Sequence, residues 1–321
     1  MPNLFICLTP LQALIAQQLI RQTAPTPAHL LMVCYAEADN AKFRHYYQTT
    51  AQLCQRADYI VVPNGKWQRE YSLYKLLKNL DKSYQTIYAA SIDNPNVQYL
   101  ISHLHFEKLE TFDDGTGNLY PDSILYRNRP YGLKRKLINL LQGMRYQTED
   151  LRRLSAQHHT LYPNQPNISP NTVPLQLWDT QPETLFSGSL KPQKILLGQP
   201  IFTRNEDNIA LFSQLCDHIQ ADAYFPHPRE NYRLDKVKYI DTILIFEDYL
   251  LQQIQMQPET EFHIYHLAST AAINVNHFPR TQIHALRPDS EFFRQPSLVY
   301  LYDLMAKMDI AIENFVLDKA A

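Results

Sequence analysis

The sequence predicts an α/β protein built from two halves, each with a parallel sheet that helices cover on both faces. Apolar, strand-like runs alternate with helix-length segments along most of the chain, and continuous apolar strands are typical of covered parallel sheets. The length of 321 residues suits two domains of about 150 residues better than one core. A proline- and asparagine-rich stretch interrupts the alternation, which indicates a crossing between the halves.

Apolar runs that read as strands organise the first half. They are NLFICLT (3–9), HLLMVCY (29–35), DYIVVP (58–63), TIYAAS (86–91) and KLETF (108–112). Helical patterns fill the gaps around 10–22, 40–56, 69–80 and 94–103. The opening run has no basic leader and Pro10 interrupts it, so a strand, a turn and a helix explain it better than a signal peptide. We therefore expect a first domain over 1–160.

The interruption lies at 161–183, and the alternation restarts after it. The strands expected there are 194–200, 222–228, 238–242, 261–269, 282–286 and a last one at 309–315. The helices expected between them are 205–220, 245–255 and 296–308. This pattern predicts a linker over 161–190 and a second domain over 191–321. Two such halves place a ligand cleft between the carboxyl ends of their sheets.

Composition excludes several classes of protein. The net charge of −2 gives no general attraction to nucleic acid. The four cysteines show no CxxC spacing and two lie in apolar runs, which indicates reduced thiols and a cytoplasmic protein. No segment approaches the ~18 uninterrupted apolar residues of a membrane span. P-loop, GxGxxG, HExxH and GxSxG motifs are absent.

The loop FDDGTGNLYPDS (112–123) follows a predicted strand and holds two of the chain's seven glycines. Adjacent carboxylates, Asp113 and Asp114, repel each other, so one of them can have a pKa high enough to accept a proton near neutral pH. Gly115 and Gly117 permit a sharp turn or the close approach of a ligand. Taken alone, the loop also fits an ordinary Asp-Gly turn or a Mg²⁺ site.

Further candidates follow the strands of the second half. In YFPHPRE, two prolines fix the backbone of His227 beside Arg229, which suits an anionic ligand or an ordinary surface loop. Ser269 and Thr270 open a helix, where hydroxyls and free amides bind anions or simply cap the helix. Glu247 also opens a helix, where an acid either complements the helix dipole or binds ribose hydroxyls. Gly198 directly follows a buried strand and permits close approach of the backbone.

The segment YRNRPYGLKRKLINLLQGMRY (126–146) surrounds an apolar run with basic residues. A basic amphipathic segment suits an anionic membrane face or acceptor phosphates, although a solvated helix face is a commoner reason for such charge. The segment 126–146 is thus a candidate for peripheral contact with a membrane.

Several of these motifs, in their order along the chain, resemble glycosyltransferase family 52, the bacterial lipooligosaccharide sialyltransferases of the Pasteurella, Neisseria and Haemophilus type. The motifs are FDDGTGNL, ILLGQP, PHPRE, IFEDY and ST after an apolar strand. The likeness runs from FICLTPLQ near the N-terminus to the helix near residue 300. It implies a GT-B fold, with two Rossmann-like α/β domains whose parallel sheets face a central cleft.

The resemblance also implies an activity. It is the transfer of sialic acid from CMP-sialic acid to a terminal galactose of lipooligosaccharide or a related galactoside, α2,3-linked, inverting, and without a metal or other cofactor. Expected partners are therefore CMP-sialic acid and a galactose-terminated glycan or glycolipid, with a homodimer and no nucleic acid. Two alternatives are a family-related transferase with another sugar-nucleotide donor and a non-catalytic sugar-nucleotide-binding protein.

On the donor side, the resemblance assigns roles residue by residue. His227 and Pro228 match a His-Pro motif that contacts the CMP phosphate, where His227 stabilises or protonates the leaving group. Ser269 and Thr270 match a second phosphate-binding element, and Glu247 stands where a ribose-binding acid is expected. The positions expected to line the nucleotide are Gly198, Gln199, Pro200, Phe225 and Pro226.

On the acceptor side, Asp113, Asp114 and Gly115 match an acid-acid-glycine motif, and we expect Thr116 and Asn118 beside them in the acceptor site. One departure concerns the catalytic base. Neisserial members carry an aspartate after the turn that here reads LLGQP, and this chain has Ile201 in its place. The base is then Asp114, which we favour, or an acid of the longer loop that follows, Glu206 or Asp207.

Overall fold

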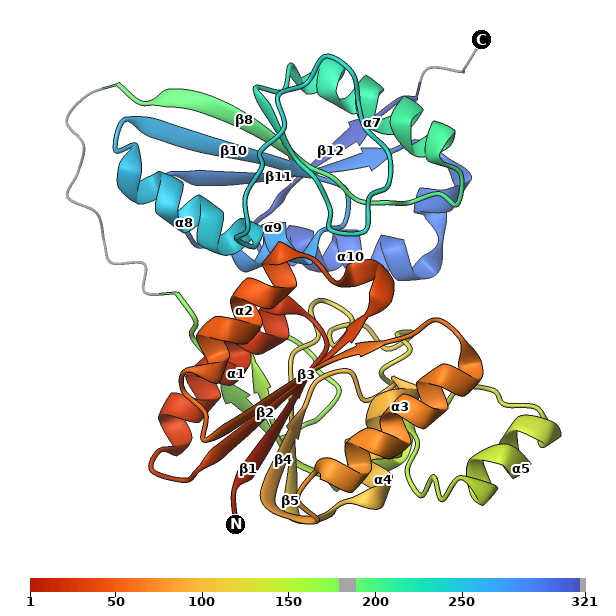
Figure 1. The fold of residues 1–321 in the computed structure, drawn as a ribbon. Helices are drawn as coiled ribbons and strands as arrows, with labels where there is room; N and C mark the ends of the chain where they lie inside the picture. Colours follow the sequence, from red (N-terminus) through yellow and green to blue (C-terminus); the bar gives the residue numbers. More distant parts are fainter. Residues whose placement is uncertain (179–188, 318–321) are drawn as a thin grey trace. The chain divides into compact units, whose positions relative to one another are not determined.

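Two parallel sheets, one in each of two units, form the frame of the protein (Figure 1). The computed structural model describes residues 1–178 and 189–317, and the chain divides into Met1–Trp178 and Asp179–Ala321. The first sheet has seven strands, the second has five, and every described pairing between their strands is parallel. The predicted α/β fold class is confirmed in both halves.

The first unit has the strand order β3-β2-β1-β4-β5-β6-β7. Its elements are β1 (Asn3–Cys7), α1 (Pro10–Thr23), β2 (Ala28–Tyr35), η1 (Ala36–Ala38), α2 (Ala41–Ala51), β3 (Arg56–Val62), α3 (Lys66–Asn79), β4 (Ser83–Ala89), α4 (Pro95–His103), β5 (His105–Phe112), α5 (Leu133–Leu141), α6 (Thr148–Leu154), β6 (Ser155–Thr160) and β7 (Thr172–Pro174). The direction in which strands are added reverses beside β1. Such a switch point is where parallel α/β sheets open a crevice for ligands.

Alternate residues of β1 explain why helices cover both faces of this sheet. Leu4 and Ile6 pack in a core cluster with residues of α3 and α4, whereas Phe5 and Cys7 pack in another with residues of α1. Figure 1 shows α1 and α2 on one face and α3 and α4 on the other. The predicted start of α1 is confirmed, because the Thr9 hydroxyl accepts a hydrogen bond from the Gln12 amide and Pro10 occupies the first turn.

The second unit has the order β12-β11-β10-β8-β9. Its elements are β8 (Lys191–Leu197), α7 (Asn205–Ile219), β9 (Ala223–Phe225), α8 (Phe246–Met256), β10 (Thr260–His266), α9 (Thr270–Asn274), β11 (Thr281–Pro288), η2 (Glu291–Arg294), α10 (Pro296–Lys307) and β12 (Ala311–Phe315). Figure 1 shows α7 on one face of this sheet and α8, α9 and α10 on the other. Here the order reverses beside β8, which gives this unit its own switch point.

The structure differs from the sequence expectation at three places. The strand β6 was not expected, because most of its residues are polar. Residues 161–178, expected in the linker, belong to the first unit, because β7 is held to β6 by bonds such as Leu175 N–H to the Thr160 carbonyl at 2.8 Å. The rest of that linker, 179–188, lies outside the described residues. The strand expected at 238–242 is wrong: only an isolated bridge joins Tyr239 to Tyr224, since β9 ends after three residues and leaves little edge to pair.

Candidate functional site

Three adjacent strands of the first sheet bring one cluster of polar side chains together at the switch point. Gln12 lies in the first turn of α1 after β1, Ser91 follows β4, and Asp114 follows β5. Because β1, β4 and β5 are neighbours and parallel, their carboxyl ends share an edge. Residues that are about 80 and 100 positions apart in the chain thereby become hydrogen-bond partners.

Asp114 accepts hydrogen bonds from both neighbours. Gln12 Nε2 donates to its Oδ1 at 2.5 Å and Ser91 Oγ donates to its Oδ2 at 2.8 Å. Burial raises the pKa of the Asp114 carboxyl, the two hydrogen bonds lower it, and the negative charges of Asp93 and Asp113 raise it again, so that the net pKa is raised. The result is a carboxylate with a fixed orientation and increased basicity, as a general base requires.

Asp113 has a different environment from Asp114. It is fully buried, and its Oδ2 accepts bonds from Leu161 N–H at 2.6 Å and from the Thr160 hydroxyl at 3.0 Å. Its Oδ1 lies 3.0 Å from Nε2 of the buried His158. Asp113 therefore holds the loop against β6. Its side chain has no exposed surface in the structure with which to make the expected contact with an acceptor.

The rest of the loop supports Asp114. Gly115 has φ +78°, a left-handed conformation that favours glycine, and it turns the chain back directly after the acid. The buried Asn118 accepts a hydrogen bond from the Asp114 amide at 3.0 Å, and its Nδ2 lies 3.0 Å from His158 Nε2. Thr116 is buried as well. Asn118 and Thr116 thus stabilise the loop from within it, rather than standing open to an acceptor.

Sequence reasoning missed Gln12 and Ser91. Each is a common polar residue with no motif of its own, and only the order of the strands reveals that it faces Asp114. The signal that was available is position: both directly follow predicted apolar strands, in the loops that a parallel sheet gathers at one edge.

In the second unit, the switch point gathers the donor-side candidates. Gly198, Gln199 and Pro200 follow β8, His227 follows β9, and Ser269 and Thr270 follow β10. These three strands are adjacent and parallel. Gln199 Oε1 accepts a hydrogen bond from the Ala268 amide at 3.2 Å, which ties the loop after β8 to the loop after β10.

The loop of His227 is held by its own neighbours. The Arg229 amide donates to His227 Nδ1 at 3.1 Å, so Nδ1 carries no proton and the proton of the neutral ring is on Nε2. Glu230 Oε1 accepts from the His227 amide at 2.9 Å and from the Tyr224 hydroxyl at 3.0 Å. Burial raises the pKa of Glu230 to about 7. This part of the loop thus presents an imidazole N–H donor in a fixed tautomer.

Gly198 is explained by these same side chains. A Cβ at this position would lie 2.0 Å from Glu230 Oε1 and 2.3 Å from the Tyr224 hydroxyl oxygen. Glycine is therefore required so that Glu230 and Tyr224 can reach the backbone after β8. The close approach predicted from the sequence exists, but its partner is the protein's own side chains.

Ser269 and Thr270 begin a helix of only five residues, and the Ser269 side chain makes no capping bond. Capping, the simpler explanation of this pair, is therefore not what the Ser269 hydroxyl does in the structure. The Ser269 amide donates instead to His266 Nδ1 at 3.0 Å, and burial lowers the pKa of His266 to about 3. A permanently neutral imidazole thus orients this backbone turn.

The remaining nucleotide-side candidates are mostly buried. Glu247 is 3% exposed and its Oε1 accepts from Asn274 Nδ2 at 2.7 Å, which gives the expected ribose-binding acid a partner inside the protein. Phe225 packs against Phe246 and Tyr249 in an aromatic cluster. Pro226 is partly buried and Pro228 is exposed on either side of His227.

Glu206 and Asp207, the alternative bases, lie in the first turn of α7. The Glu206 side chain is 74% exposed, and Arg204 Nε lies 3.7 Å from its carboxylate and 3.8 Å from that of Asp207. The preceding loop is fixed by the buried Asn208, which accepts from the amides of Ile201 and Phe202 at 2.9 Å each. Solvation and a cationic neighbour keep these acids in an ordinary surface environment, unlike that of Asp114.

Among the helices of the described residues, none has the length and apolar character needed to cross a membrane.

Comparisons with known proteins agree with one another. A model of glycosyltransferase family 52 matches residues 28–290. The CMP-N-acetylneuraminate:beta-galactoside alpha-2,3-sialyltransferase of Pasteurella multocida is 36% identical over 312 residues, which cover 97% of this chain and 98% of that protein. The N-acetyllactosaminide alpha-2,3-sialyltransferase of Haemophilus influenzae is 32% identical, with 97% and 98% covered. The Neisseria meningitidis protein with the same name is 25% identical, with 98% and 85% covered.

Proposed function

The chain belongs to glycosyltransferase family 52, and from this we propose that it transfers sialic acid from CMP-sialic acid to the terminal galactose of a galactoside in an α2,3 linkage. The names of the Pasteurella and Haemophilus relatives, which match nearly the whole chain, support the donor, the acceptor sugar and the linkage. The geometry of each unit supports separate parts of the chemistry.

The observation that carries the proposal is the environment of Asp114. Its carboxylate is oriented by Gln12 and Ser91, and its pKa is raised mainly by burial. A base of this kind accepts the proton of the galactose 3-hydroxyl as the oxygen attacks the anomeric carbon of sialic acid. The Glu206 side chain, by contrast, is 74% exposed, and its ion-pair neighbour within the described residues is Arg204 at 3.7 Å. We therefore assign the base to Asp114.

The other half of the reaction is departure of CMP. As the new bond to the galactose oxygen forms, the bond between the anomeric carbon and the phosphate oxygen breaks, and the phosphate keeps the electron pair. The N–H of His227 Nε2 stabilises this oxygen by hydrogen bonding, and the hydroxyls of Ser269 and Thr270 add donors. A single displacement inverts the anomeric configuration. Our proposal routes no step through a metal ion.

We further propose that the acceptor is a glycolipid, such as lipooligosaccharide, which the protein meets at a membrane surface. On α5, Leu133, Leu137, Leu140 and Leu141 are 85%, 58%, 72% and 78% exposed. Exposed Lys134 and Lys136 flank them on the same helix. Exposed leucines beside lysines suit an interfacial helix whose apolar side enters the lipid headgroup region while its cations face anionic lipids.

The test is release of CMP from CMP-sialic acid, measured with and without lactose, N-acetyllactosamine and a non-galactoside sugar. We expect release that depends on a galactoside, and a product that an α2,3-specific sialidase cleaves. Thermal shifts with CMP, UDP and GDP check the donor independently, because a ligand that binds the native state raises its melting temperature. Stabilisation by UDP or GDP but not by CMP would reject the sialyl donor. Binding of CMP without any release would indicate a non-catalytic protein.

A further inference from the structure

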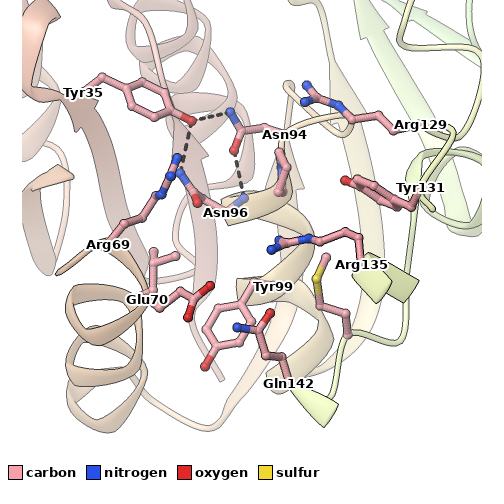
Figure 2. Close-up of a pocket in the computed structure, with 13 residues that line it drawn as sticks. Tyr35, Arg69, Glu70, Asn94, Asn96, Tyr99, Arg129, Tyr131, Arg135 and Gln142 are labelled. Carbon is pink, nitrogen blue, oxygen red and sulfur yellow. Dashed lines mark hydrogen bonds between the residues drawn. The ribbon is translucent and has the colours of Figure 1, made fainter. Parts of the chain in front are cut away.

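The first unit contains a cavity of about 400 Å³ that none of the proposed reaction steps uses. It is lined by the end of β2, by α3, by the start of α4 with the residue before it, and by residues between Arg129 and Met144, all within the first unit. Its volume falls within the range of about 300–1,000 Å³ that is typical of small-molecule sites. Figure 2 shows the polar side chains that surround it.

Three guanidinium groups and the carboxylate of Glu70 line the cavity and leave it a net positive charge. Arg69 projects from α3 on one side of the cavity and Arg135 from α5 on the other, and Arg129 is the third guanidinium of the lining (Figure 2). Arg129 is paired with Asp93 at 2.9 Å, whereas the guanidinium groups of Arg69 and Arg135 have no hydrogen-bond or ion-pair partner within the described residues. Both side chains are partly buried, so the protein removes part of their water. An anion bound between them would supply the hydrogen bonds and the opposite charge that this water would otherwise provide.

The remaining lining suits a sugar better than a bare anion. Tyr35, Tyr99 and Tyr131 offer flat apolar faces, and Glu70 and Gln142 offer hydrogen-bonding groups for hydroxyls. The Tyr131 hydroxyl is buried and has no partner among the described residues, and Figure 2 shows it directed toward the cavity. An unsatisfied buried hydroxyl is uncommon in a folded protein and indicates a missing partner.

One wall of the cavity is held by hydrogen bonds and lies close in sequence to Ser91, a partner of the candidate base. The Tyr35 hydroxyl accepts from Asn94 Nδ2 at 2.7 Å and from Asn96 Nδ2 at 3.1 Å. The same loop, three residues before Asn94, carries Ser91, which donates to Asp114. The loop after β4 therefore serves the candidate base at one end and the cavity at the other.

We propose that this cavity binds an acidic sugar, with a phosphate or carboxylate between Arg69 and Arg135, as part of the acceptor beyond its terminal galactose. The proposal rests on the proposed function for the identity of the acceptor, but the binding itself does not. It makes the cavity a specificity site that distinguishes an acidic glycolipid from a neutral galactoside.

Direct binding tests the site without turnover. Thermal shift is measured with glucose 6-phosphate, glucuronate, glucose and inorganic phosphate, each at millimolar concentration. We expect at least one of the two acidic sugars to raise the melting temperature more than glucose or phosphate does, and the two identify which anion is preferred. An equal rise with inorganic phosphate would overturn the sugar site, as would no difference between the acidic sugars and glucose.

Variants then locate the binding. Arg69→Gln with Arg135→Gln should abolish the response to the acidic sugar, whereas His227→Ala should retain it, which excludes binding at the donor phosphate position. Lys75→Gln with Arg127→Gln is the matched control, since it removes the same charge from exposed side chains outside the cavity. A retained response in the Arg69/Arg135 variant, or a lost response in the control, would refute the assignment.

Kinetics connect the cavity to the acceptor. The KM for lactose 1-phosphate should be roughly ten-fold below that for lactose, as expected for one added charge-assisted contact. In the Arg69/Arg135 variant, the KM for lactose 1-phosphate should rise about ten-fold and the KM for lactose should stay unchanged. Equal KM values for the two acceptors in the unmodified protein would remove the acceptor role. Absence of any turnover of lactose would instead reject the proposed function and leave the binding result standing.

Discussion

Substitution of Ser91 by alanine is the most direct test of how the first unit prepares Asp114. The change removes one of the two side-chain donors to the carboxylate, at 2.8 Å, and leaves the Gln12 contact at 2.5 Å in place. A hydrogen bond to a charged group contributes about 1.5–3 kcal/mol. Because Asp114 is partly exposed and water can replace part of the lost bond, the lower end of this range applies.

The consequence is a shift of the pH profile. A donor to the carboxylate stabilises its charged form and lowers its pKa, so loss of the donor raises the pKa. An energy of about 1.4 kcal/mol corresponds to one pKa unit. We therefore expect the acidic limb of kcat/KM to move upward by about one pH unit in Ser91→Ala. Below its midpoint the activity should fall about ten-fold, and at high pH it should return to that of the unmodified protein.

The assay is CMP release at several pH values with subsaturating lactose. Ser169→Ala is the matched control, since Ser169 is another buried serine of the first unit, and its hydroxyl accepts only from the Asn171 amide in the described part of the chain. Its profile should not move. A uniform loss of activity at all pH values in Ser91→Ala, or an acidic limb displaced downward, would refute the reasoning.

Five further variants test other parts of the proposal. Asp114→Asn should lower turnover by about 10²-fold or more. Because the pKa of Asp114 is raised in the folded protein, ionisation of this carboxyl lowers the stability of the fold as pH rises. The melting temperature of Asp114→Asn should therefore exceed that of the unmodified protein at pH 8, and the difference should narrow toward pH 4. Glu206→Gln should retain turnover, and a loss as large as that of Asp114→Asn would move the base to α7. His227→Ala should lower turnover by roughly 10²-fold with CMP-sialic acid saturating, and near-normal turnover would contradict the leaving-group role. The pKa of Glu230 is about 7 in the folded protein, against an ordinary value of 4.5, so the unfolding free energy should fall as pH rises between these values. Denaturant titrations of Glu230→Gln should show no such fall. An unchanged dependence on pH would contradict the argument that burial raises this pKa. Leu137→Glu with Leu141→Glu should abolish co-sedimentation with anionic vesicles while turnover of lactose is kept; binding that survives would exclude α5 as the membrane contact.

The architecture was accessible from the sequence because its signal is local. Central strands such as β1 and β2 are nearly continuous apolar runs, and helix starts such as Thr9-Pro10 carry their own capping chemistry. Residues 161–178 were harder to interpret, since β7 spans three residues and owes its place to bonds with β6 rather than to its own composition. The strand expected at 238–242 fails for the opposite reason: its composition is right, but its neighbour β9 is too short to pair with it.

The candidate site divides in the same way. The loop 112–123 and the His227 loop could be found as unusual local combinations of acids, glycines, prolines and histidine. The different roles of Asp113 and Asp114 could not be predicted from the sequence, because two adjacent identical residues differ only in what the fold packs against them. One is saturated by Thr160, Leu161 and His158, and the other faces Gln12 and Ser91.

By itself the sequence determined the α/β class, the two halves and the loops that carry the chemistry, since apolar periodicity and turn residues act within a few positions of the chain. Only the tertiary structure decided which residues of those loops share an environment. Strand order places β1, β4 and β5 side by side, and burial then raises the pKa of one carboxyl while hydrogen bonds fix its direction. The cavity between Arg69 and Arg135 has the same origin, because its walls come from helices more than 50 residues apart.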